Sequence, residues 1–128
     1  MTPHRWVDYL FILVMIVLTV YGQMILKWRM DQLGPLPGGF WPALRHLLAL
    51  LVDPAIVSSF VAAFIASLAW MAAMTRFELS YAYPFTSLNF VVVLVLSVWL
   101  LGETFTWNKV AGVALIVLGT LVASADGA

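Results

Sequence analysis

Four long apolar stretches restrict this chain to one class of fold. They are predicted at about residues 7–27, 54–76, 82–101 and 107–124. A helix that crosses a bilayer needs roughly 20 residues, because the hydrocarbon core is about 30 Å thick and each residue rises about 1.5 Å. Each stretch is long enough, so the chain is predicted to be an all-α integral membrane protein, built as a four-transmembrane-helix bundle.

The scarcity of charge excludes the other classes of protein. Only 9% of the 128 residues are charged, whereas a soluble domain has roughly 25%. Six basic and six acidic side chains give a formal net charge of zero, so no basic patch is available for nucleic acid. No Asp, Glu, Lys, Arg or His lies deep within an apolar stretch. Ion-coupled carriers usually keep a carboxylate there, and its absence argues against such coupling.

The segment between the first two stretches is predicted to be a loop with a short helix, over residues 34–52. Gly34–Gly39 is rich in Gly and Pro, which is typical of a loop. Trp41–Val52 is too short to span and is interpreted as an interfacial helix that carries Arg45 and His46. Asp53 and Pro54 then give the N-cap and first-turn signals of the second span. Residues 1–128 are expected to form a single domain.

The first stretch is interpreted as a retained span rather than a signal peptide, because it is too long and no small-residue cleavage site follows it. The positive-inside rule favours cytoplasmic first and third loops. Four basic side chains lie on that side against two on the other, a difference small enough to leave inverted or dual insertion open. They are Lys27, Arg29, Arg45 and Lys109 against Arg5 and Arg76.

Polar side chains within the spans are the candidates for function. They are Thr19, Tyr21 and Gln23 in the first span, and Thr86, Ser87 and Asn89 in the third. Asn89 is the costliest, because a primary amide in hydrocarbon needs up to about four hydrogen-bond partners. Two interpretations stay open: a groove that binds a polar head group, or hydrogen bonds that hold the helices together.

The cations at the ends of the spans also allow two interpretations. Lys27, Arg29 and Arg76 either extend towards the lipid headgroups or bind a lipid phosphate at the membrane surface. Glu78 is a candidate counter-ion for Arg76. Gly112 and Gly119 lie seven residues apart on one face of the fourth span. Small residues allow close packing of helices, so these two glycines are predicted at a dimer interface, with packing inside the subunit as the alternative.

The C-terminal half carries three motifs: Ala82-Tyr83-Pro84, Leu101-Gly102-Glu103, and the paired glycines. With them the chain resembles the drug/metabolite transporter superfamily, in the half-size branch that contains small multidrug resistance proteins and EamA-type domains. Within this branch it is most similar to the small subunits of undecaprenyl-phosphate aminoarabinose flippases. That similarity includes A-Y-P-x-x-S-L-N-F-V over residues 82–91 and G-Q-x-x-x-K over residues 22–27.

The resemblance implies a small multidrug resistance-like four-helix fold that acts as a homodimer or as a heterodimer with a paralogous subunit, often antiparallel. Small multidrug antiporters carry a Glu three residues before the first-helix Gly, and Thr19 stands at that position here. The coupling chemistry of that group therefore does not transfer. The resemblance implies a head-group path lined by Gln23, Lys27, Tyr83, Ser87 and Asn89, and Arg76 joins them as a phosphate-binding candidate.

The hypothesis that follows is a lipid flippase, or a subunit of one, in the bacterial inner membrane. Its substrate would be a polyprenyl-phosphate-linked sugar, including an amino sugar of lipopolysaccharide modification. The alternatives are a small-solute or multidrug exporter of the same fold, coupled through Glu78 or Glu103, and a non-transporting partner that supports a larger membrane enzyme. An enzyme, a cofactor and a metal site are not expected, because the spans hold no catalytic set and His4 and His46 lie outside them.

Overall fold

The computed structural model describes residues 6–125, and everything it describes outside the turns is helical. His4 and Arg5 lie outside this range. The elements are α1 (Trp6–Leu33), α2 (Phe40–Ala49), η1 (Leu50–Val52), α3 (Pro54–Met74), α4 (Leu79–Ala82), η2 (Tyr83–Ser87), α5 (Leu88–Leu100) and α6 (Trp107–Ala125).

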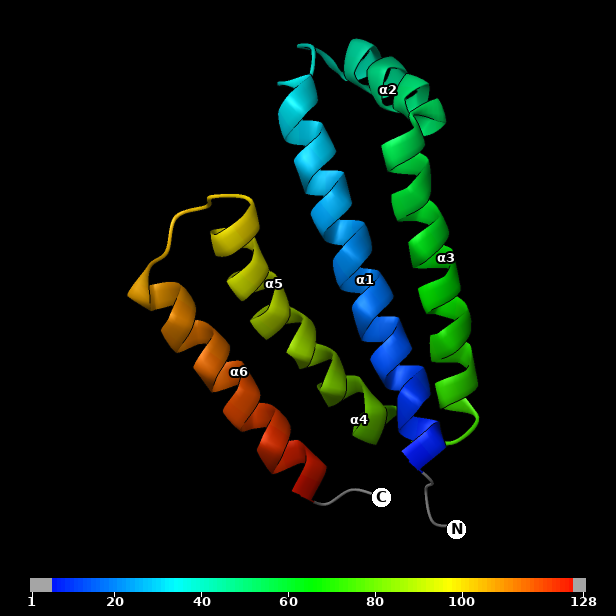
Figure 1. Ribbon diagram of the computed structural model, residues 1–128, viewed down its shortest axis with the longest axis vertical. Helices are drawn as coiled ribbons and strands as arrows, with labels where there is room; N and C mark the ends of the chain where they lie inside the picture. Colours follow the sequence, from blue (N-terminus) through cyan, green and yellow to red (C-terminus); the bar gives the residue numbers. More distant parts are fainter. Residues whose placement is uncertain (1–5, 126–128) are drawn as a thin grey trace.

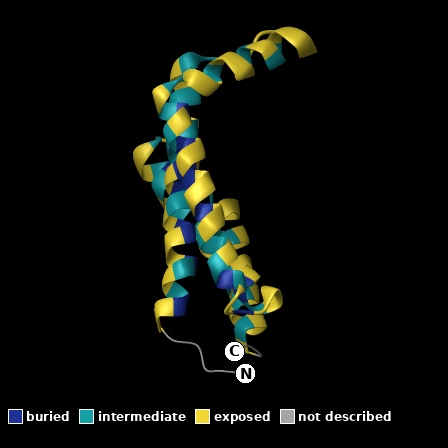
Figure 2. Ribbon diagram, turned by 90° about the vertical axis from the view of Figure 1, so that its right-hand side faces the viewer, coloured by how far each residue is buried: buried dark blue, intermediate teal, exposed yellow. Residues whose placement is uncertain are grey.

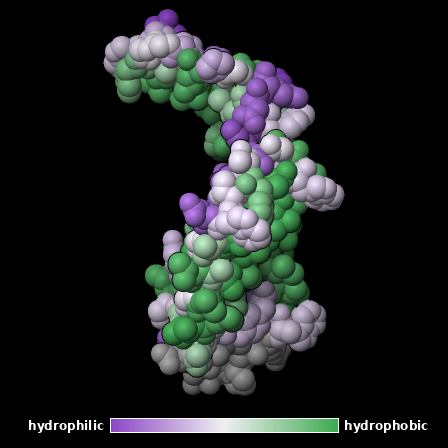
Figure 3. Space-filling model, turned by 90° about the vertical axis from the view of Figure 1, so that its left-hand side faces the viewer, coloured by the Kyte–Doolittle hydropathy of each residue, from purple (hydrophilic) through white to green (hydrophobic). Residues whose placement is uncertain are grey.

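Four segments of this range are long and apolar enough to cross a membrane. They are Trp6–Leu33, Pro54–Met74, Leu79–Leu100 and Trp107–Ala125. The predicted all-α membrane fold with four spans is therefore confirmed. Figure 3 shows one face of the molecule, where hydrophobic surface covers the helices and hydrophilic residues gather towards the upper end.

The ends of the helices follow local signals in the sequence. Gly34 ends α1 with a φ of 81°, and Gly102 follows α5 with a φ of 68°, a region that glycine adopts without steric cost. At the start of α3, Asp53 Oδ1 accepts hydrogen bonds from the backbone N–H groups of Ala55 at 3.0 Å and Ile56 at 3.4 Å. Pro54 occupies the first turn, where its missing N–H costs nothing.

The third span bends where it begins. α4 has four residues and passes into the 3₁₀-helix η2, which contains Pro84. Because proline lacks an N–H, the backbone there cannot continue regular α-helical bonding, and a short 3₁₀ turn takes its place. This turn places Tyr83 and Thr86 on one side of the chain and Ser87 on another, just before α5 begins.

The helices pack as two pairs. α1 and α3 lie side by side along their length, and α5 and α6 form the second pair (Figure 1). The pairs lie closest at the end that carries α4, and they diverge towards the loop between α5 and α6 (Figure 1). The two pairs also meet along part of α5, because Val92, Val93 and Leu96 pack against the α1–α3 core.

The buried core lies along the seam between α1 and α3, as the dark blue residues of Figure 2 show. It contains Ile12, Met15, Ile16 and Val20 of α1, Ala66 and Ala73 of α3, and Phe77 and Ala82. Small residues bring the two backbones close: a Cβ on Gly22 would lie 3.1 Å from the Ser59 carbonyl oxygen. Close approach through small residues is the usual way in which membrane helices associate.

α2 stands apart from this core. It has no buried residue and projects sideways from the upper end of the bundle (Figure 2). Its hydrophobic side chains include exposed Phe40, Trp41 and Leu48. An amphipathic helix of this kind suits the membrane surface, and its interfacial location stays a prediction.

Candidate functional site

A cavity of about 520 Å³ lies between α1 and α3 and reaches η2. Its polar lining consists of hydroxyls and one amide and contains no charged group: Thr19, Gln23, Ser59, Ser67, Tyr83 and Thr86. The remaining lining is apolar or aromatic, with Met15, Phe60, Trp70 and Met71 among the larger side chains. Gln23, Phe60, Ser67 and Tyr83 are exposed, so the cavity opens on the surface of the helix pair.

Most hydroxyls of the cavity donate to their own helix. Ser59 donates to the Ile56 carbonyl at 2.7 Å, Ser67 to the Ala63 carbonyl at 3.0 Å, and Thr86 to the Tyr83 carbonyl at 2.6 Å. Their oxygens keep lone pairs that can accept a further hydrogen bond. The Gln23 amide makes no hydrogen bond within residues 6–125, so it can both donate and accept. The cavity therefore offers hydrogen-bond donors and acceptors to a polar group that carries several hydrogen-bonding atoms.

An aromatic pair forms part of this lining. The rings of Trp70 and Tyr83 meet edge to face, with centroids 6.1 Å apart. Tyr83 was expected in the site, whereas Trp70, Ser59 and Ser67 were not. The sequence signal for these three α3 residues was weak, because a serine that bonds to its own helix and an interfacial tryptophan are common in membrane helices.

Ser87 and Asn89 do not line this cavity. Ser87 is buried and its hydroxyl hydrogen-bonds to that of Thr120 in α6. Thr120 also lies 3.2 Å from the Pro84 carbonyl, so this contact joins η2 to α6. The Asn89 side-chain oxygen is buried and has no hydrogen-bond partner among the described residues. The structure therefore brings Gln23 and Tyr83 together and places Ser87 and Asn89 outside that group.

Lys27 lies one residue beyond Leu26, which is the last α1 residue that lines the cavity. Its ammonium is 2.9 Å from Asp31 Oδ1, one helical turn further along α1. It is also 3.9 Å from Glu103 Oε2, which belongs to the loop between α5 and α6. Both ion pairs are partly exposed, so the Lys27 side chain is held by carboxylates and remains accessible.

Arg76 lies at the opposite end of the α1–α3 pair. Its Nε is 3.5 Å from Asp8 Oδ1, so the carboxylate within reach of Arg76 is Asp8 rather than Glu78. Asp8 is 7% exposed, although its place at the start of the first apolar stretch indicates an interfacial position. The same end holds a hydrogen bond of 3.0 Å between the hydroxyls of Tyr9 and Tyr81. Arg76 itself is largely exposed.

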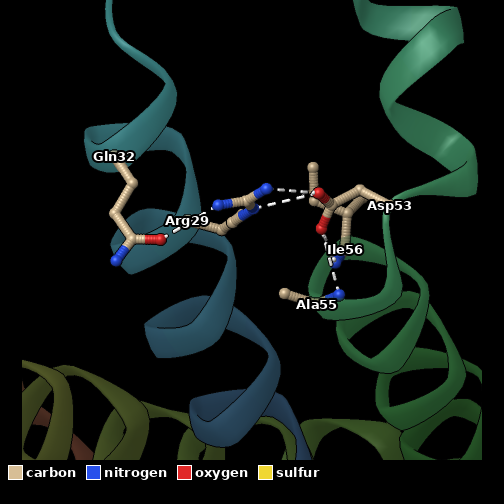
Figure 4. Close-up of polar contacts among 5 residues, drawn as sticks. All are labelled: Arg29, Gln32, Asp53, Ala55 and Ile56. Atoms are coloured by element: carbon tan, nitrogen blue, oxygen red, sulfur yellow. Dashed lines mark hydrogen bonds and ion pairs between the residues drawn. The ribbon is translucent and has the colours of Figure 1, made fainter.

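Arg29 is fully engaged in the structure (Figure 4). Its Nε and Nη2 donate to Asp53 Oδ2 at 3.0 and 2.8 Å, and its Nη1 donates to Gln32 Oε1 at 3.1 Å. The Arg29 hydrogen bond is the largest cause that holds the pKa of Asp53 below its ordinary value. The Arg29–Asp53 pair thus joins the end of α1 to the start of α3, and Arg29 is less available to a ligand than Lys27.

The α6 glycines face open space within the subunit. No atom of the described chain lies within 4 Å of a Cβ built on Gly112 or Gly119. The residues that α6 directs towards α5 are others, including Val110, Val113, Ala114 and Val117, which line an apolar space of about 720 Å³ between the two helices. The glycine face is therefore available to a second molecule. Residues 6–125 contain no cluster of His, Asp or Glu that could hold a metal ion.

Comparisons with known proteins agree with this picture of a membrane transporter. Residues 5–125 match the model of the EamA-like transporter family. The chain is 37% identical, over 88% of its length and 91% of the relative's, to an Erwinia tasmaniensis protein named "Probable 4-amino-4-deoxy-L-arabinose-phosphoundecaprenol flippase subunit ArnF". It is 32% identical, over 90% and 95%, to an Aeromonas hydrophila protein with the same name except for its ending, "subunit ArnE". No solved structure matches the chain.

Proposed function

The chain belongs to the EamA-like transporter family, and from this premise we propose that it is a flippase subunit for a polyprenyl-phosphate-linked amino sugar. The relatives named as flippase subunits cover most of its length, which supports this assignment. It is a multi-pass membrane protein, and as a subunit of such a flippase it acts in the bacterial inner membrane. Its role is transport rather than catalysis.

One observation carries the proposal: the largely apolar cavity between α1 and α3 contains hydroxyls and an amide but no charged group. A sugar has several hydroxyls, and each unpaired polar group costs several kcal/mol in hydrocarbon. Gln23, Tyr83 and the lining hydroxyls would replace water as hydrogen-bond partners while the head group crosses. The prenyl tail would stay in the surrounding lipid, since the cavity opens on the surface of the helix pair.

The phosphate would meet a cation at each end of this path. Lys27 follows the last lining residue of α1 at one end, and Arg76 lies at the other end of the α1–α3 pair. Lysine and arginine both bind phosphate through charge-assisted hydrogen bonds. No coupling ion is required if reactions on one side of the membrane consume the delivered lipid.

The active form is a dimer in this proposal, either of two copies or with a paralogous four-helix subunit. The open face at Gly112 and Gly119 would form the interface, because small residues let helices approach closely. Ser87 and Asn89 would belong to the α5–α6 side of the path, and the unsatisfied Asn89 oxygen would accept a hydrogen bond from the substrate. The relatives are themselves named as subunits, which supports a multi-subunit assembly.

A small-solute or multidrug exporter is the second candidate, because a largely apolar cavity of about 520 Å³ also suits a drug-sized molecule. Coupling would then require a carboxylate, and Glu78 and Glu103 are the candidates. Proton-driven uptake of a quaternary cation into proteoliposomes, lost in Glu103→Gln, would favour the exporter over the flippase.

The test is translocation of a lipid-linked amino sugar in proteoliposomes that contain the chain, alone or with a paralogous subunit. We expect Gln23→Leu to lower the rate at least tenfold, because it removes an amide from the cavity without adding volume. Gln32→Leu is the matched control, since Gln32 lies on the same helix outside the cavity, and it should keep the wild-type rate. No translocation by the wild-type assembly, or equal rates for the two variants, would contradict the proposal.

A further inference from the structure

Two separate sequence motifs meet at the open end of the helix bundle. Lys27 closes the G-Q-x-x-x-K motif at the end of α1, and Glu103 closes the Leu101-Gly102-Glu103 motif after α5. Their charged atoms lie 3.9 Å apart, although the two residues are far apart in the chain. Glu103 has no role in the flippase function proposed above, and its contact with Lys27 suggests one.

The loop conformation fixes the position of the Glu103 backbone. Gly102 adopts a φ of 68°, and the N–H of Glu103 donates to the Ser97 carbonyl at 3.1 Å. This arrangement caps the end of α5 and holds the Glu103 backbone against the helix. Lys27, in contrast, has a long flexible side chain with three donors, so it is the mobile member of the pair.

The third span packs on the α1–α3 core through Val92, Val93 and Leu96 of α5, and aromatic contacts join it to α1 at the opposite end. There the Tyr9 and Tyr81 hydroxyls hydrogen-bond at 3.0 Å, and the Tyr9 ring packs against Phe85 with centroids 6.2 Å apart. Towards the α5–α6 loop the pairs diverge (Figure 1). Within the described chain, the Lys27–Glu103 contact is the one polar side-chain contact between α1 and the second pair at this end.

Lys27 can exchange its ion pair with Glu103 for a contact with another anion. The Lys27 side chain is 51% exposed, and exposed ion pairs contribute little net stability because water screens them. Lys27 already holds Asp31 at 2.9 Å within its own helix, and Glu103 is the more distant partner at 3.9 Å. Lys27 with Asp31 and Glu103 carries a net negative charge, and this charge opposes the binding of a further anion until one carboxylate withdraws. Glu103 is the carboxylate that Lys27 can release without breaking a contact inside α1.

We propose that Glu103 competes with the substrate phosphate for Lys27, so that phosphate binding parts α1 from the α5–α6 loop and phosphate release brings them together again. This inference rests on the proposed function, because it takes Lys27 as the phosphate-binding residue. Glu103 then acts as a positioning residue. It keeps Lys27 at the end of the cavity without substrate, and it lowers the affinity for phosphate so that the lipid can leave.

Binding of polyprenyl phosphate to the protein in nanodiscs tests the competition. We expect Glu103→Gln to bind this lipid at least threefold more tightly than the wild type, because the amide no longer competes for the ammonium. Polyprenol, which lacks the phosphate, should bind both proteins equally. Glu78→Gln is the matched control, since Glu78 lies in the loop at the opposite end of the bundle, and its affinity should equal that of the wild type. Equal affinities of wild type and Glu103→Gln would overturn the proposal.

A distance measurement tests the movement and guards against a folding defect. The chain has no cysteine, so spin labels can be attached uniquely to Trp28→Cys and Thr104→Cys on the two sides of the contact. Polyprenyl phosphate should shift the label distance to longer values in the wild type. Glu103→Asp, which keeps the charge, should retain the short distance without lipid, and Glu103→Gln should lose it. A distance that is unchanged by lipid and by both substitutions would also overturn the proposal.

The two proposals can fail separately. If the wild-type assembly translocates the lipid-linked amino sugar but Glu103→Gln changes neither affinity nor distance, the competition is wrong and the flippase stands. If polyprenyl phosphate binding responds to Glu103→Gln as expected but no sugar lipid is translocated, the competition stands and the assigned substrate is wrong.

Discussion

At the scale of single residues, the unsatisfied side-chain oxygen of Asn89 distinguishes a role in translocation from a role in holding helices together. Its buried side-chain oxygen has no hydrogen-bond partner within residues 6–125. A buried acceptor without a partner costs about 1–3 kcal/mol, so a substitution that removes it should not destabilise the fold. This separates Asn89 from residues whose polar groups hold helices together, such as Ser87 with Thr120.

We therefore expect Asn89→Leu to abolish translocation while its thermal stability stays equal to or above that of the wild type. The measurement is translocation in proteoliposomes beside thermal unfolding in detergent. Ser87→Ala is the comparison, because it breaks the contact with Thr120 and should lower stability. Wild-type translocation by Asn89→Leu would remove this residue from the path.

The Arg29–Asp53 pair makes the stability of the fold depend on pH, and the direction of this dependence follows from the pKa of the Asp53 carboxyl group. The hydrogen bond from Arg29 holds the pKa of Asp53 below its ordinary value, so the folded state binds the proton more weakly than the unfolded state. The pair thus stabilises the fold above about pH 4, and this contribution is lost as pH falls through the lowered pKa.

Asp53→Asn should remove that contribution while it keeps a side chain that can cap α3. We expect a melting temperature a few degrees below that of the wild type at pH 7 and a smaller difference between the two proteins below about pH 4. Thermal unfolding in detergent across this pH range measures both. A difference that stays constant with pH would show that the charge of Asp53 does not contribute.

At the scale of elements, the close contact between α1 and α3 depends on Gly22. A Cβ at this position would lie 3.1 Å from the Ser59 carbonyl oxygen, which is backbone and cannot move aside alone. We expect Gly22→Ala to destabilise the detergent-solubilised monomer by about 1–3 kcal/mol, because the helices must separate to admit the methyl group. Reversible unfolding of the monomer measures this change.

Gly112→Ala is the control for that measurement, because no atom of the described chain lies within 4 Å of its Cβ. Alanine favours a helix over glycine by roughly 1 kcal/mol, so the control should be neutral or stabilising. Equal destabilisation by both substitutions would show that the loss at Gly22 does not come from the α1–α3 contact.

The elements themselves could be predicted from the sequence, because hydrophobic length alone sets a membrane span. Asp53 with Pro54 marked the start of a helix that the structure also shows. The cavity lining was harder to foresee. Gln23 and Tyr83 were expected in the site, but the share of α3, with Ser59, Ser67 and Trp70, depends on which face of that helix packs on α1. The α3 sequence is apolar on all sides, so periodicity does not reveal that face.

The sequence also does not predict which charged residues form long-range ion pairs. Lys27 and Arg76 were recognised as interfacial cations, but their partners Glu103 and Asp8 lie far along the chain. A charge at the end of an apolar stretch looks the same whether it faces lipid headgroups or another helix. The packing of α1 on α3 brings Arg76 to Asp8, and the course of the third span after η2 brings Glu103 to Lys27 (Figure 1).

At the scale of the whole molecule, the packing is uneven, and the last helix is the least covered. None of the apolar window of α6 is buried, whereas 28% of the windows in α1 and α3 is buried. The α6 residues that face α5 include Val113, Ala114 and Val117, which lie on the side opposite Gly112 and Gly119. The glycines thus present a smooth, uncovered face that only another molecule can pack against.

Gly112→Leu should therefore shift the protein from dimer towards monomer by at least tenfold in the dissociation constant, because the side chain would fill the space that a second helix needs. Ala114→Leu is the matched control: it introduces the same side chain on the face towards α5, where an apolar space of about 720 Å³ can receive it. Sedimentation equilibrium in detergent measures both, and the control should keep the wild-type dissociation constant. If Gly112→Leu remains as dimeric as the wild type, the interface lies elsewhere and the α6 glycines face lipid.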